Sequence, residues 1–144
     1  MKTSTLVDSN VLIDVWGSPG AMTEWSSSTL TMCNGEGLLV VNVVVWAELA
    51  PLVPTEASLE SVSTRLGLDK ESVPWSAAFL AGRAHLQYRR QGGVRERTLP
   101  DFLIGAHALV AGHRLLTRDP ARYRGYFPDL EIIAPDTHPV GQRL

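Results

Sequence analysis

The stretch STLVDSNVLIDVW, residues 4–16, joins two apolar segments near the start of this 144-residue chain. Its first four residues, 4–7, have the composition of a short buried strand, and Asp8 follows them directly. A new apolar run begins at Val11 and indicates a helix. A carboxylate therefore stands where a buried strand ends and a helix begins. Asp is a good N-cap, so Asp8 is predicted to be either a helix cap or one wall of a metal site.

The composition is typical of a single globular domain without disulfides. The chain carries 44% apolar residues, enough to bury a core at this length, and it has one cysteine, Cys33. A chain with no possible intrachain disulfide fits a reducing compartment, and we expect a cytoplasmic protein. The longest apolar run, 38–46, is too short to span a bilayer, and no secretory signal pattern precedes the first strand.

The two halves of the chain carry opposite net charge. Residues 1–71 hold nine acids and three bases, whereas residues 72–144 hold six acids and ten bases, all of them arginines. A run of arginines is either an ordinary solvated surface or a flank that binds phosphate groups.

Predicted strands and helices alternate along the chain. Strands are expected at 4–7, 38–41, 71–75, 115–117 and 131–133, and helices at 9–16, 19–32, 43–53, 56–66, 75–91, 102–111 and 120–123. A turn is expected at 34–37. This alternation, with short apolar strands, predicts a parallel sheet covered by helices on both faces. Ligands of such sheets bind beyond the carboxyl ends of the strands.

Four acidic residues lie at or near these strand ends or in a helix start: Asp8, Glu48, Asp101 and Asp119. Taken singly, most have an ordinary structural explanation, as a cap for Asp8, a first-turn acid for Asp101 and a cap before a proline for Asp119. Glu48 is harder to explain in this way, because the segment VVVWAELA leaves little polar helix face.

Together, the four acids predict a metal site. Carboxylates that converge raise one another's pKa unless a cation joins them, and Mg²⁺ or Mn²⁺ suits such oxygen ligands. The ion would lower the pKa of a bound water and neutralise charge on a phosphoryl oxygen. The four histidines share no ligand spacing, so core or surface positions are expected for them. The expected chemistry is therefore hydrolysis by metal-activated water.

Four segments resemble a known family: LVDSNVLIDVW, VVNVVVWAELA, TLPDFLIGAHALVAG and LLTRDPARYRGYFPDLEIIAP. In this order, from about residue 4 to residue 135, they resemble the PIN-domain ribonucleases, and most of all the VapC-type toxins of bacterial toxin–antitoxin pairs. The resemblance implies a PIN-like three-layer α/β/α sandwich around a central parallel sheet. It also implies one nuclease domain over residues 1–135. Residues 136–144 have no clear counterpart in the family and are expected to form a mobile C-terminal tail.

The resemblance also implies what individual residues do. Asp8 and Asp101 would be the main ligands of Mg²⁺ or Mn²⁺, and Glu48 and Asp119 would complete the site directly or through waters. The implied reaction is endonucleolytic cleavage of single-stranded or structured RNA, leaving 5′-phosphate and 3′-hydroxyl ends. Polar residues that support the acids are expected at three positions: Ser9, Asn10 and Thr117.

Partners follow from the same resemblance. Family members usually form homodimers and are silenced by a cognate antitoxin, so both partners are expected, with no membrane association. Four arginines, Arg89, Arg90, Arg95 and Arg97, precede Asp101 and are expected as a group to contact RNA phosphates. The alternative is that these arginines only keep the surface soluble or pair with acidic residues of the antitoxin.

Three other functions stay open on the sequence. An aspartyl-phosphate phosphatase usually needs a second Asp two residues after its nucleophile, and this chain has Asn10 there, which argues against it. The same residues also fit a protein that binds RNA or a partner without turnover, and a nuclease that acts on DNA.

Overall fold

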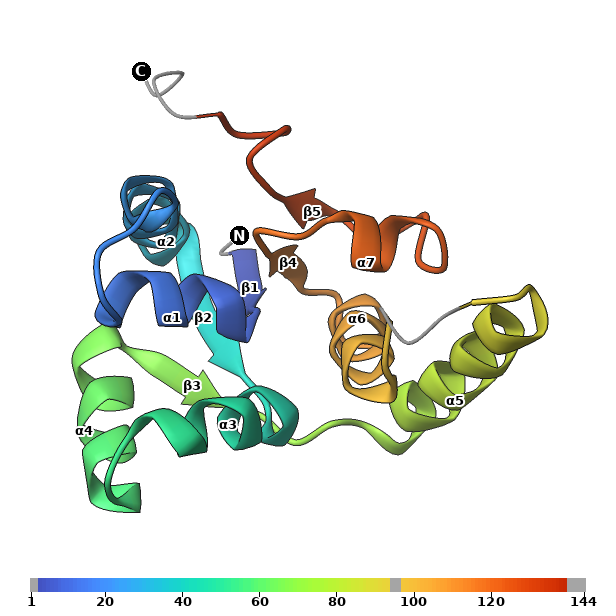
Figure 1. The fold of residues 1–144 in the computed structure, drawn as a ribbon, viewed down its shortest axis with the longest axis horizontal. Coiled ribbons are helices and arrows are strands. Elements are labelled where there is room, and N and C mark those ends of the chain that lie inside the picture. The colour runs from blue at the N-terminus through green and yellow to red at the C-terminus, as the bar shows by residue number, and fades with distance from the viewer. Residues whose placement is uncertain (1–2, 94–96, 140–144) are drawn as a thin grey trace.

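A computed structural model describes residues 3–93 and 97–139 of the chain. Within them, parallel strands form one sheet in the order β3-β2-β1-β4-β5 (Figure 1). The strands are β1 (Thr3–Val7), β2 (Gly37–Val41), β3 (Leu68–Lys70), β4 (Arg114–Leu116) and β5 (Ile132–Ile133). The helices are α1 (Ser9–Trp16), α2 (Thr23–Glu36), α3 (Val43–Leu49), the 3-10 helix η1 (Ala50–Leu52), α4 (Glu56–Leu66), α5 (Trp75–Arg90), α6 (Leu99–Ala111) and α7 (Ala121–Arg124).

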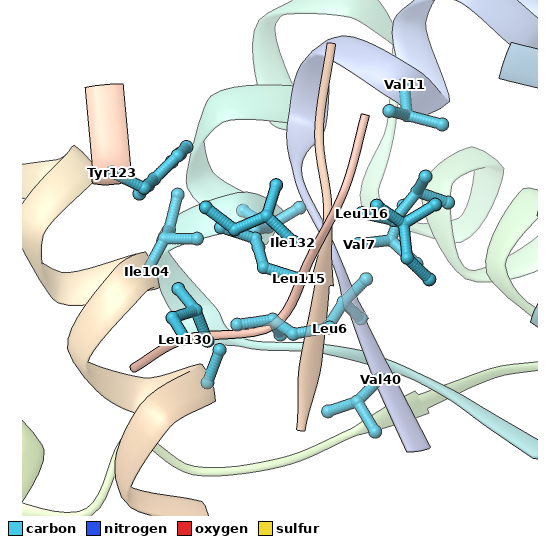
Figure 2. Packing of buried hydrophobic residues seen from close by; sticks show 14 of the residues in the cluster. Leu6, Val7, Val11, Val40, Ile104, Leu115, Leu116, Tyr123, Leu130 and Ile132 are labelled. Atoms are coloured by element: carbon cyan, nitrogen blue, oxygen red, sulfur yellow. The ribbon is translucent and has the colours of Figure 1, made fainter. Parts of the chain in front are cut away.

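Helices bury both faces of the sheet. Consecutive residues of β1 and β4 point to opposite sides: Leu6 and Leu115 toward α6, and Val7 and Leu116 toward Val11 of α1 (Figure 2). All five side chains are fully buried. Figure 1 shows α1 to α4 gathered on one side of the sheet and α6 on the other, with α5 packed outside α6. The three-layer α/β/α architecture with a central parallel sheet, expected from the sequence, is confirmed.

The parallel arrangement brings three strand ends to one edge of the sheet. β1 is central and pairs with β2 on one side and β4 on the other, with Leu6 opposite both Val40 and Leu115. The residues that directly follow these three strands therefore share the carboxyl edge, and they are Asp8, Asn42 and Thr117.

Helix α2 extends through a predicted turn. The turn expected at 34–37 is instead the end of α2, which runs from Thr23, not from residue 19, as far as Glu36. Gly37 directly follows the helix and opens β2, where it pairs with Thr3. A Cβ atom on Gly37 would lie 1.6 Å from the carbonyl oxygen of Thr3. The glycine therefore serves a close approach of two backbones and not a turn.

The third strand lies earlier than predicted. β3 is Leu68–Lys70, whereas the strand predicted at 71–75 is a connection that ends at the first residue of α5. β3 is an edge strand, and its residues Asp69 and Lys70 are exposed. No buried apolar run marks it in the sequence, which explains the error.

Two predicted helices have different limits in the structure. The helix expected at 43–53 is α3 followed by η1, because Pro51 cannot continue the α-helical hydrogen bonds. Helix α6 begins at Leu99 and not at 102, which places Asp101 in its first turn. The remaining strands agree with the sequence within one residue at each end.

The residues that follow β5 contact the rest of the chain. Arg124 forms a two-bond ion pair with Asp136, at 2.6 and 2.8 Å, and the indole of Trp25 donates a hydrogen bond to the carbonyl of His138 at 2.7 Å. Residues 140–144 lie outside the described part, so the division into a domain over 1–135 and a tail over 136–144 stays a prediction. No helix among the described residues is long and apolar enough to cross a membrane.

Replacing Gly37 by Ala is expected to lower the free energy of unfolding by about 2–3 kcal/mol, because the new methyl group overlaps the backbone of Thr3. Urea unfolding measures this change. The control is Gly35→Ala in α2, two residues earlier, where a Cβ meets nothing within 4 Å, and a gain of about 0.5–1 kcal/mol is expected. Equal stability of the two variants would contradict this reading of Gly37.

Candidate active site

Asp8 is a buried carboxylate at the end of the central strand, with 4% of its surface exposed. It caps α1, with its Oδ1 accepting a hydrogen bond from the backbone N–H of Ser9 at 2.8 Å. Its Oδ2 accepts hydrogen bonds from the hydroxyls of Thr117 at 2.9 Å and Tyr123 at 2.7 Å. Burial raises the pKa of Asp8 and outweighs these hydrogen bonds, which lower it, and the charge of Asp101 raises it further.

Asp101 lies in the first turn of α6 and is 5% exposed. Its Oδ2 accepts a hydrogen bond from the backbone N–H of Thr98 at 3.2 Å, so the N–H of the residue that precedes the helix has a partner. Its Oδ1 faces the guanidinium of Arg122 at 3.4 Å. Asp101 is therefore, like Asp8, both a helix-capping acid and a member of the acid group, the name used here for the four predicted acids.

Glu48 stands at the exposed rim of the group, on α3. Its Oε1 accepts a hydrogen bond from the hydroxyl of Ser9 at 3.0 Å. Partial burial raises the pKa of the Glu48 carboxyl, and the charges of Asp8 and Asp101 add to this rise, whereas the bond from Ser9 lowers it.

Asp119 belongs to the loop after β4 and is partly exposed. The side-chain amide of Asn10 donates to its Oδ2 at 3.2 Å, and its backbone N–H donates to the hydroxyl oxygen of Thr117 at 3.0 Å. The structure thus brings the four predicted acids to one edge of the sheet. Each of the three predicted supporting residues contacts at least one of the acids: Ser9, Asn10 and Thr117.

Two further residues of this site, Arg122 and Tyr123, were not predicted from the sequence. Arg122 lies 3.4 Å from Asp101 and 3.7 Å from Asp119, and these acids, with Asp8, raise its pKa even though burial acts to lower it. Its spacing of three residues from Asp119 was the available sequence signal. Tyr123 is fully buried, and its pKa is raised well above its usual value by burial and by Asp8.

The donor atoms of the acid group fit a hard divalent cation. The site offers four carboxylates, two of them from the buried side chains Asp8 and Asp101, whose charges destabilise the ionised form of Glu48. A bound cation would relieve that repulsion. Among the described residues, however, no three of these acids have ligand atoms within 4.8 Å of one another, and the nearby positive charge is Arg122.

A second group of potential ligands consists of Glu71, His107 and His113, whose ligand atoms all lie within 4.8 Å of one another. The Nε2 atoms of His107 and His113 lie 2.9 and 2.6 Å from Oε1 of Glu71. Burial acts to raise the pKa of Glu71, but the hydrogen bonds from the two histidines outweigh it and lower that pKa. Sequence analysis did not anticipate that these histidines meet.

The amide of Asn42 determines where His107 carries its proton. Its Oδ1 caps α3 by accepting a bond from the N–H of Val45 at 3.0 Å, so its Nδ2 faces Nδ1 of His107, also at 3.0 Å. The neutral ring then holds its proton on Nε2 and donates it to Glu71. Metal binding through Nε2 of His107 would move the ring proton to Nδ1. The side-chain amide of Asn42 would then have to turn, which would break its cap on α3. The arrangement therefore favours a hydrogen-bond network over a metal site.

Solved structures share this fold at low sequence identity. A chain of VapBC-1 from nontypeable Haemophilus influenzae has a TM-score of 0.70 at 16% identity, covering 92% of this chain and 98% of that one. A chain of VapBC2 from Rickettsia felis, bound to a DNA fragment from their promoter, has a TM-score of 0.68 at 15% identity, with coverages of 92% and 98%. A chain of FitAcB from Neisseria gonorrhoeae has a TM-score of 0.61 at 17% identity, with coverages of 93% and 99%.

No protein-family model and no curated protein sequence matches the chain. At the identities found, the similarity to solved structures shows the fold. The likeness to VapBC proteins, expected from four sequence segments, is confirmed at that level.

Tyr123→Phe is expected to lower the free energy of unfolding at neutral pH by about 1–3 kcal/mol, because Asp8 loses a buried hydrogen bond that stabilises its charge. The pKa of Asp8 rises further, which NMR of the carboxyl carbon measures. The control is Tyr126→Phe, which loses an exposed bond to Gln91 and should change stability by less than about 0.5 kcal/mol.

The effect of losing the hydrogen bond from Tyr123 to Asp8 is expected to depend on pH. The pKa of Asp8 is raised in the folded protein, so its ionisation favours unfolding, and stability falls as pH rises from about 4 through the folded pKa. Below pH ~4, Asp8 is protonated in both states, and the deficit of Tyr123→Phe should shrink. A deficit that is constant with pH, or equal to that of Tyr126→Phe, would refute this reading.

Proposed function

We propose that this chain is a VapC-type toxin, a metal-dependent endoribonuclease that cleaves single-stranded or structured RNA. One observation carries the proposal: two buried carboxylates, Asp8 and Asp101, lie with Glu48 and Asp119 at the carboxyl edge of the parallel sheet. The fold is shared with VapBC structures. Ligands of open parallel sheets bind at this edge.

Mg²⁺ or Mn²⁺ is the metal that such oxygen donors favour. Asp8 and Asp101 would hold it, and Glu48 and Asp119 would complete its surroundings. When bound, the ion lowers the pKa of a water molecule and neutralises charge on a phosphoryl oxygen.

Neighbouring side chains orient the acids for this function. Thr117 and Tyr123 hold one oxygen of Asp8, and the backbone of Ser9 holds the other. The hydroxyl of Ser9 holds Glu48 at the rim. Outer hydrogen bonds of this kind fix the direction of a ligand's lone pairs, so they determine how well the site fits an ion.

Asn10 also bears on the phosphatase alternative. A phosphatase would use an acid two residues after its nucleophile, but Asn10 donates its side-chain amide to Asp119 and accepts from the N–H of Arg118. It thereby ties the loop that carries Asp119 to the start of α1. This arrangement supports a positioning residue and not a second acid.

The polyanionic substrate is proposed to approach over the arginine-rich half. Arg89 and Arg90 lie exposed at the end of α5, where they are available to phosphates, and Arg97, which precedes α6, is partly exposed. Arg95, predicted to belong to the same group, lies outside the described residues. A cognate antitoxin is the proposed protein partner and the cytoplasm the proposed compartment.

A homodimer is proposed to form through α5. Trp75 and Phe79, one helical turn apart, are 92% and 67% exposed, and Leu86 extends the same stripe. An apolar stripe of this kind is typical of a protein interface, and a twofold axis would pair it with its own copy.

Wild-type protein is expected to cut labelled single-stranded RNA in Mg²⁺ or Mn²⁺ and not in EDTA. Asp8→Ala and Asp101→Asn should each reduce the rate more than about 100-fold, since even outer partners of a metal ligand contribute 10- to 100-fold. The matched control is Asp129→Asn, because Asp129 is an exposed acid that does not follow the carboxyl end of β1 or β2. Gel electrophoresis measures cleavage, with DNA of the same sequence alongside.

The nuclease proposal fails if wild type cuts no RNA and binds it equally well in EDTA. Preferred cleavage of the DNA would identify a DNA nuclease instead. In cells, inducing the wild-type gene without its partner should stop growth, and Asp101→Asn should relieve the arrest. Equal toxicity of the two proteins would contradict the proposed mechanism.

Trp75→Ser combined with Phe79→Ser is expected to convert the dimer to a monomer, because the substitutions remove the apolar area of the stripe. Light scattering after size exclusion measures the mass. Leu52→Ser is the control, since Leu52 is half exposed on η1, outside the stripe. A wild-type monomer, or a double variant that stays dimeric, would rule out this interface.

A further inference from the structure

Three arginines line a hollow next to the acid group. The hollow has a volume of about 350 Å³, and its walls are Arg97, Arg118, Asp119, Pro120, Ala121 and Arg122. The arginines come from three places in the chain: before α6, after β4 and within α7. Guanidinium groups outnumber carboxylates among the lining residues by three to one, while Asp14 and Asp101 contact Arg118 and Arg122 from outside the walls.

Arg118 is anchored at one nitrogen and open at the others. Its buried Nε lies 3.0 Å from Oδ2 of Asp14, without hydrogen-bond geometry, and Ser26 donates a bond to the same oxygen at 2.7 Å. Within residues 3–93 and 97–139, no acceptor contacts its two terminal nitrogens. An anchored guanidinium with free terminal nitrogens is preorganised to bind an anion.

Arg97 makes a cation–π contact and, among the described residues, no ion pair. Its guanidinium carbon lies 5.6 Å from the centre of the Tyr88 ring. No carboxylate in the described part of the chain pairs with it. A cation–π contact uses none of the guanidinium N–H groups as hydrogen-bond donors to an oxygen, so they are available to other ligands.

Arg122 connects the hollow to the acids. Its contacts with Asp101 and Asp119 are long, 3.4 and 3.7 Å. Arg124, on the same short helix and equally exposed at 45%, instead makes a close two-bond pair with Asp136. Arg122 is therefore the looser of the two, and its guanidinium is free to exchange a carboxylate for a phosphate.

We propose that this hollow binds a backbone phosphate of the RNA, next to the phosphate that lies at the acids; the identity of the ligand rests on the proposed function. Planar guanidinium groups recognise phosphodiester oxygens in pairs. The acids alone would repel a polyanion, and the adjoining arginines offset that repulsion. The strand would then pass from Asp8 and Asp101 over Asp119 toward Arg97.

Fluorescence anisotropy of a short labelled single-stranded RNA tests the site in EDTA, where binding is measured without cleavage. Arg97→Ala, Arg118→Ala and Arg122→Ala are each expected to weaken binding about three- to tenfold at ~0.1 M salt. The triple variant should reduce the slope of log affinity against log salt by about 0.7, the value for one phosphate of a single strand. Arg124→Ala is the matched control and should bind as wild type does.

The proposal is overturned if the three variants bind RNA as tightly as wild type and Arg124→Ala, whether or not wild type cleaves RNA. It is also overturned if the three substitutions weaken binding of the antitoxin and leave RNA binding unchanged, because the hollow then takes a protein carboxylate. Arginine-dependent RNA binding without cleavage in Mg²⁺ or Mn²⁺ would instead uphold the site and refute the nuclease function. Melting temperatures of all variants establish that each is folded.

Discussion

The hydrogen bonds around the Asp8 carboxylate are the interaction on which the rest of the structure depends. A carboxylate with 4% exposure is stable only when its oxygens are satisfied, and here three donors satisfy them. The donors come from α1, from the end of β4 and from α7. A single buried charge thus ties together elements that are more than 100 residues apart in the sequence.

Tyr123 shows how core packing and the site share the same residues. Its ring is fully buried on the α6 side of the sheet (Figure 2), while its hydroxyl donates to Asp8. The residue before it, Arg122, consequently stands over Asp101 and Asp119. The fold therefore fixes both a partner for the buried acid and a positive charge beside the acid group.

The sequence predicted the parts of the fold that depend on local patterns. Apolar strands followed by helices predicted the parallel sheet, and the sheet in turn predicted that Asp8, Glu48 and Asp119 would lie near its carboxyl edge. The edge strand β3 was misplaced because its residues are polar and exposed. The turn expected at 34–37 was wrong because Gly37 meets the needs of a neighbouring strand, which no local pattern reveals.

The missed parts of the site depend on contacts between distant residues. His107 and His113 lie 36 and 42 residues from Glu71, so no ligand spacing connects the three. Tyr123 and Asp8 are 115 residues apart. Such pairs become visible only when the sheet order is known, whereas Asp8 and Asp119 already stood at or near predicted strand ends and Asp101 just before a predicted helix.

Anomalous X-ray scattering from a crystal grown with Mn²⁺ would locate the metal relative to the acid group. We expect a peak between the carboxylates of Asp8 and Asp101. A peak at Glu71, His107 and His113, with none at the acid group, would refute the proposed metal site.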